Sequence, residues 1–91
     1  MIFEWDEAKS RANARDRLLP FDLGVAMFDG MTLEAVDERR DYGERRIRAL
    51  GAVRALCLVC VYTDREDIRR IISLRMANRR ERDDYRKALE G

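Results

Sequence analysis

Arginine is the most abundant residue type in this sequence that could bind a phosphate or stabilise negative charge. Seventeen of the 19 basic residues are arginines, and Lys9 and Lys87 are the only lysines. A guanidinium is a planar fork that can hold a phosphate through two hydrogen bonds at once. Residues 1–38 carry four basic and nine acidic side chains, a net charge of −5, whereas residues 39–91 carry fifteen and nine, a net charge of +6. This separation predicts a basic surface for a polyanion; an ordinary solvated surface of an arginine-rich protein is the alternative.

The sequence contains no histidine, which restricts the possible catalysts. Catalytic triads or dyads that need histidine are excluded, as are most zinc sites. Ser73 has no histidine or nearby lysine to activate it and is not expected to be a nucleophile. Cys57 and Cys60 lie in an apolar run typical of a strand, where residues three apart point to opposite faces. We therefore expect two apolar core cysteines, with no metal site and no cofactor.

Length and composition indicate one small soluble domain spanning residues 1–91. The chain is 46% hydrophobic and 41% charged, too apolar for a disordered tail and too charged for a membrane protein. It lacks an apolar stretch of about 20 residues and an N-terminal signal-peptide pattern. A cytoplasmic protein without membrane contact is expected.

Local patterns predict the elements that must position the arginines. Residues 2–5 are apolar and aromatic, typical of a short strand, and Asp6 can cap a helix that runs to about Arg17. Pro20 ends that region and can open a second helix, which Asp29-Gly30 ends. Alternating or continuous apolar patterns then predict four strands, at 31–36, 44–50, 55–63 and 68–75.

A C-terminal helix is predicted from Asn78, because Asn78 and Glu81 have the spacing of a capping box. Strict alternation would put Arg70 on one face of the last strand with Ile72 and Leu74, and Arg75 on the other. Gly51-Ala52 is expected to connect the second and third of the four strands. The order predicts an α+β fold: a small, mainly antiparallel sheet with two N-terminal helices and one C-terminal helix.

Several motifs together resemble the BrnT family, small ribonuclease toxins of bacterial type II toxin-antitoxin pairs with a RelE-like fold. The resemblance runs from Phe3 to Tyr85 and rests on Phe3-Glu4-Trp5-Asp6, Lys9, Asn13, Asp37-x-Arg39, Tyr42-Gly43-Glu44-Arg45-Arg46, Val61-Tyr62-Thr63, Arg70-Ile71-Ile72-Ser73, Arg75 and Ala77. The sequence departs from the family in two places. Asp16-Arg17-Leu18 stands where the family tends to have Lys-His-Gly, and Leu74 where it tends to have alanine.

The resemblance implies an endoribonuclease that cleaves RNA and inhibits translation. It also implies a cognate ribbon-helix-helix antitoxin, similar to BrnA, that neutralises the toxin and represses the shared operon. Contact with operator DNA would be only indirect, through the antitoxin. The alternative is a catalytically inactive binding module that serves only as antitoxin partner and transcriptional co-repressor.

Metal-independent cleavage by a 2′-hydroxyl needs cations around the phosphate and a proton acceptor. Arg46 and Arg75, which lie in motifs shared with the family, are the predicted catalytic clamps, and the predicted RNA contacts are Arg40, Arg48 and Arg70. The alternative for Arg70 is a stem that covers apolar surface and a head paired with an acid.

Glu44 is the predicted base, since it is a carboxylate among arginines, which should lower its pKa and weaken it. An ordinary ion pair is the alternative for Glu44. Tyr62 is predicted to stack on a base or orient a phosphate, with Tyr42 and Tyr85 as alternatives for the same work. Tyr62 could instead cap the core.

Overall fold

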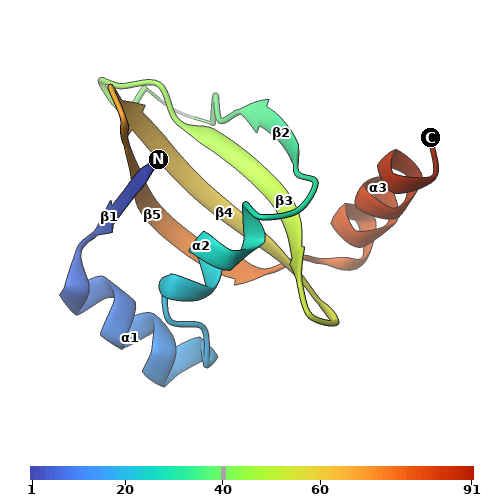
Figure 1. Ribbon diagram of the computed structural model, residues 1–91, viewed down its shortest axis with the longest axis horizontal. Helices are drawn as coiled ribbons and strands as arrows, with labels where there is room; N and C mark the ends of the chain where they lie inside the picture. Colours follow the sequence, from blue (N-terminus) through green and yellow to red (C-terminus); the bar gives the residue numbers. More distant parts are fainter. Residues whose placement is uncertain (40) are drawn as a thin grey trace.

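The computed structural model describes residues 1–39 and 41–91, and the expected α+β class is confirmed (Figure 1). Among these residues, five strands form one sheet in the order β1-β5-β4-β3-β2, in which only the β1–β5 pair is parallel. The elements in chain order are β1 (Ile2–Trp5), α1 (Glu7–Arg17), α2 (Asp22–Met27), β2 (Leu33–Val36), β3 (Ile47–Val53), β4 (Leu56–Arg65), β5 (Ile68–Met76) and α3 (Arg79–Glu90). Among the described residues, no helix is long and apolar enough to span a bilayer.

Helices cover both faces of the sheet. On the α2 face, Met27 packs against a fully buried layer from β4 and β5 that includes Leu58, Ile71 and Leu74. On the α3 face, Tyr85 of α3 packs with a smaller cluster, Leu50, Val59 and Ala77. The two cysteines fall on different faces, as predicted, with Cys57 beside the α3 cluster and Cys60 in the α2 cluster, and both are free thiols.

Helix α1 is held to the rest of the domain mainly by polar contacts. The Asp6 carboxylate accepts from the backbone N–H of Lys9 at 3.2 Å, which confirms the predicted cap. The Asn13 amide donates to the carbonyls of Leu19 and Leu74, at 2.7 and 2.9 Å. Because Leu74 lies on β5 beyond the stretch that β1 pairs, Asn13 ties α1 to the open edge of that strand.

Leu18 ends α1 in the left-handed conformation that glycine favours, with φ 61° and ψ 28°. Its side chain is 82% exposed, so little packing offsets the strain of about 1–2 kcal/mol. We expect Leu18→Gly to raise the free energy of unfolding by about 0.5–1 kcal/mol, after the entropy cost of glycine. Urea denaturation can measure this, with Leu18→Ala as the control that keeps the strain. A less stable Leu18→Gly protein would contradict the prediction.

The expected connection at Gly51-Ala52 is wrong, because β3 continues through both residues to Val53. The turn lies instead at Arg54, which adopts φ 56°. Gly51 serves close packing, since a Cβ placed there would lie 2.3 Å from Cγ of Met27. The next hairpin also differs from the expected ends, because β4 extends to Arg65 and the turn falls at Glu66, with φ 57°.

A β-bulge in β5 overturns the predicted division of its side chains. Val61 pairs with Ser73 and Tyr62 with Ile71, which leaves Ile72 as an extra residue. The extra residue changes the alternation, so Ile71 and Leu74 both enter the α2 face. Arg70 and Arg75, predicted to lie on opposite faces, consequently share the α3 face.

Candidate functional site

Arginines flank the centre of β4 on the α3 face of the sheet. Arg48 of β3 pairs with Val61, while Arg75 and Arg70 of β5 pair with Val59 and Thr63. Because side chains alternate along a strand, these three arginines emerge on the same face. Three of the predicted cationic residues are thus gathered on one surface.

Arg75 is held in place by Glu81 of α3. The two side chains form two parallel hydrogen bonds of 2.8 and 2.9 Å, and Glu81 is the more buried partner. Glu81 also completes the predicted capping box, since its carboxylate accepts from the N–H of Asn78 at 2.9 Å. One carboxylate therefore fixes both the start of α3 and the orientation of Arg75. The hydrogen bonds from Arg75 lower the pKa of Glu81 to about 2.

Arg39 is positioned in the same way by Asp37, which is only 4% exposed. Both carboxylate oxygens accept from the Arg39 guanidinium at 2.8 Å. These bonds lower the pKa of Asp37 to about 2. Asp37, Arg39 and Glu81 are not among the site residues predicted from the sequence, although the Asp-x-Arg spacing and the capping-box glutamate were visible signals.

Arg48 joins these two pairs into one cluster. Its positive charge lowers the pKa of both Asp37 and Glu81, and the charge of Arg39 acts on Arg75. Within the described part of the chain, Arg48 itself has no ion pair. We call Arg39, Arg48 and Arg75, with Asp37 and Glu81, the arginine cluster. Three guanidinium groups against two carboxylates leave a net positive charge, suited to an anion with several oxygens.

The two carboxylates of the cluster should make the domain sensitive to acid. A folded-state pKa below the unfolded value stabilises the fold above the unfolded pKa, and this stabilisation is lost as the pH falls through the folded pKa. For Asp37 and Glu81, this stabilisation is lost between about pH 5 and about pH 2. The loss amounts to about 2 kcal/mol of the free energy of unfolding for each carboxylate. Denaturant titrations over this range should show a shallower pH dependence for Glu81→Gln than for the wild type. The same dependence of unfolding free energy on pH in both proteins would contradict this prediction.

Glu44 and Arg46 lie outside the arginine cluster and pair with each other. The Glu44 carboxylate accepts from Arg65 at 2.9 Å and from Arg46 at 3.3 Å, so the pKa of Glu44 is lowered, as expected. Arg46 also lies over the ring of Tyr42, 3.9 Å from its centroid. These contacts match the ion-pair alternative for Glu44, and its role as a base stays a prediction.

The structure does not bring Tyr62 to the arginine cluster. Its ring is 3% exposed on the α2 face, edge-on to Phe28, and its hydroxyl donates to Glu34. The Arg69 guanidinium covers the ring at 3.9 Å, and burial raises the pKa of Tyr62. Tyr62 packs in the core because its place on β4 puts it on the face opposite Val61. The Tyr62 ring is therefore not exposed for the predicted stacking on an RNA base.

The remaining predicted positions have separate environments. Arg70 pairs with Glu4 of β1 at 3.3 Å, which matches the alternative of a paired head. The hydroxyl of Tyr85 donates to the carbonyl of Met31 at 2.7 Å, under α3. Arg40 lies outside the described residues.

Most of the chain matches one known protein family. Residues 5–81 match the family described as ribonuclease toxin, BrnT, of type II toxin-antitoxin system. No curated protein matches the sequence. The match begins at Trp5, the last residue of β1, ends at Glu81 in the first turn of α3, and includes every residue of the arginine cluster. The chain therefore belongs to the BrnT family of ribonuclease toxins of type II toxin-antitoxin systems.

Proposed function

We propose that this protein is a metal-independent endoribonuclease with a RelE-like fold, which inhibits translation by cutting RNA. The arginine cluster is the observation that carries the proposal. The guanidinium groups of Arg39 and Arg75 are oriented before any substrate binds, by the buried carboxylate of Asp37 and the partly buried carboxylate of Glu81. Little reorganisation of these two groups is therefore needed when negative charge develops. A site of this kind stabilises a transition state better than mobile surface cations would.

In the proposed reaction, the 2′-hydroxyl of one nucleotide attacks the adjacent phosphorus. The 2′ oxygen loses its proton to a carboxylate, the bond between phosphorus and the 5′ oxygen breaks, and the 5′ oxygen takes up a proton from water. The products are a 2′,3′-cyclic phosphate and a free 5′-hydroxyl. Arg48 and Arg75 would hold the non-bridging oxygens, and Arg39 would approach from the segment after β2.

Glu44 is the proposed proton acceptor, supported by its ionised state and its 25% exposed side chain. Its lowered pKa makes it a weak base, so we assign most of the rate enhancement to charge stabilisation by the arginines. Arg46, which donates to Glu44 at 3.3 Å, would orient that carboxylate.

A type II toxin has an antitoxin partner, and we propose that this one is a BrnA-like ribbon-helix-helix protein. The antitoxin would neutralise the toxin in the cytoplasm and bind operator DNA. The toxin would contact that DNA only indirectly, through the antitoxin. The support for this partner is family membership.

An RNA cleavage assay with the purified, antitoxin-free protein tests the proposed activity. We expect cleavage in excess EDTA and 2′,3′-cyclic phosphate ends, detected by mass spectrometry of a short oligonucleotide. A 2′-deoxy substitution at the cut position should block the reaction. Intact RNA with a folded wild-type protein would contradict the proposal and favour the inactive binding module. Activity that EDTA abolishes and Mg²⁺ restores would contradict metal independence.

A further inference from the structure

The basic residues of the acidic first half are gathered on one helix. Residues 1–38 have a net charge of −5, yet all four of their cations lie on α1, namely Lys9, Arg11, Arg15 and Arg17. The same helix carries only two acidic residues, Glu7 and Asp16. Helix α1 is therefore a positive element within an otherwise negative half of the chain.

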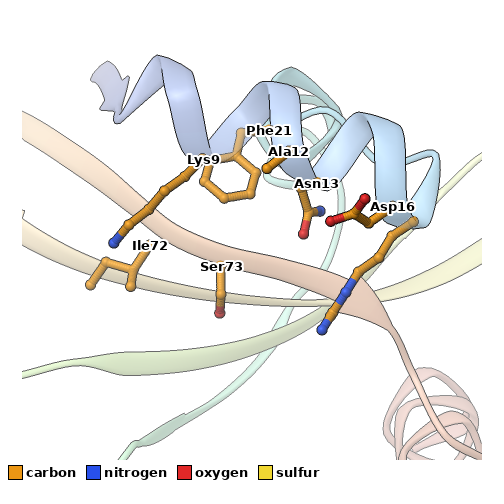
Figure 2. Close-up of a pocket in the computed structure, with 8 residues that line it drawn as sticks. Lys9, Ala12, Asn13, Asp16, Phe21, Ile72 and Ser73 are labelled. Carbon is orange, nitrogen blue, oxygen red and sulfur yellow. The ribbon is translucent and has the colours of Figure 1, made fainter.

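This helix borders a cavity at the open edge of β5. The cavity has a volume of about 380 Å³ and lies between α1 and the strand, where Asn13 ties the two together. Figure 2 shows the Lys9 side chain extending from α1 toward β5, with Ile72 and Ser73 on the facing strand. Arg17 lines the same cavity, and so does Asp16.

The cavity adjoins β5, the strand that carries two of the cations of the α3 face, Arg70 and Arg75. Ile72 is the bulge residue of β5, and Ser73 precedes Arg75 by two positions on the same face of the sheet. A chain held at the arginine cluster could cross β5 at the bulge and continue beside α1. The bulge therefore lies between the arginine cluster and the cavity beside α1.

The charges in the cavity are available to a ligand. Lys9 and Arg17 have no ion pair among the described residues, whereas Asp16 is paired with Arg15 at 3.1 Å. The two cations are eight positions apart, about 12 Å along the helix. At this spacing the two side chains can contact different phosphates of one strand. The site can thus contact more than one phosphate.

We propose that this cavity, through Lys9 and Arg17, binds the phosphate backbone of the RNA strand flanking the cleavage position. The proposal rests on the proposed function and extends it from a single scissile phosphate to a run of single-stranded RNA. An acidic segment of the antitoxin is the competing occupant. RNA is favoured because the cavity is continuous with the strand that presents Arg75.

The test uses RNA that is 2′-O-methylated throughout, which cannot react, in lengths of about 3 and about 12 nucleotides. The test variant is Lys9→Gln with Arg17→Gln. The matched control is Lys87→Gln with Arg11→Gln, which removes the same two residue types from exposed helix positions outside the cavity. Fluorescence anisotropy at several salt concentrations measures the dissociation constant of each RNA for the wild type and for each variant.

We expect the test variant to bind the long RNA about tenfold more weakly and to lose about 1.4 from the slope of log affinity against log salt. Binding of the short RNA should match the wild type, and the control should match it for both lengths. Equal effects of the two variants, equal losses for both lengths, or no binding of long RNA by the wild type would overturn the proposal. So would lost affinity for the antitoxin alone.

Binding and cleavage measured on the same samples separate the RNA site in the cavity from the nuclease activity. Wild-type protein that shows the expected length and salt dependence but leaves unmodified RNA intact contradicts the proposed nuclease and supports the cavity as an RNA site. Wild-type protein that cleaves RNA, while the test variant binds the long RNA as the control does, contradicts the cavity and leaves the nuclease standing.

Discussion

Replacing Arg75 with alanine is expected to slow RNA cleavage by about 100-fold to 1000-fold, the usual loss when one preorganised donor to a developing charge is removed. The domain should stay folded, because the Arg75 side chain is 37% exposed and lies beside rather than within the apolar cluster. Single-turnover cleavage rates and thermal unfolding of the same samples measure both effects.

Two further variants separate charge from orientation at this position. Arg75→Lys keeps the charge but loses the fork, so we expect a rate between those of the wild type and Arg75→Ala. Glu81→Gln can keep the capping box but releases Arg75 from its carboxylate, so it should lower the rate constant more than it weakens RNA binding. Arg79→Ala, at an exposed position on α3, is the control. An Arg75→Ala protein that cleaves at the wild-type rate, or that does not fold, would exclude the catalytic role.

Replacing Gly51 with alanine should produce a large loss of stability. The added Cβ would lie 2.3 Å from Cγ of Met27, a fully buried side chain between α2 and the sheet. Moving Met27 is expected to cost about 1–3 kcal/mol, more than the gain of about 0.5–1 kcal/mol from removing a glycine in a strand. Urea denaturation measures the difference. Gly30→Ala, where nothing lies within 4 Å of the added atom, is the matched control.

A double-mutant cycle identifies Met27 as the cause. In a Met27→Ala background the space around Gly51 is open, so Gly51→Ala should cost at least about 1 kcal/mol less than in the wild type. The same cost in both backgrounds would show that the strain lies elsewhere in β3.

Features that depend on neighbouring residues in the chain were predictable. Asp6 caps α1 and Asn78 forms its capping box with Glu81, because such hydrogen bonds span only three residues. The opposite directions of Cys57 and Cys60 followed from strand alternation alone. The α+β class followed from the order of the patterns, and the concentration of arginine after residue 38 pointed to the half of the chain that carries the arginine cluster.

The division of β5 could not be predicted from alternation. The bulge at Ile72 arises where β5 meets β4, and it places Arg70 and Arg75 on one face. Gly51 looked like a turn residue, because nothing in its own segment reveals that Met27 packs against it. Tyr62 looked available for stacking, although its strand position directs it into the α2 face.

Composition and local patterns were enough to predict the residue types available for catalysis, with many arginines and no histidine, and the signals that begin and end most helices and strands. Tertiary structure decided which arginines act together and what orients them. Asp37 and Glu81 lie 44 positions apart, yet their pKa values respond to the same Arg48. Strand register and one inserted residue control such proximity, and these depend on pairing between distant segments that local sequence does not encode.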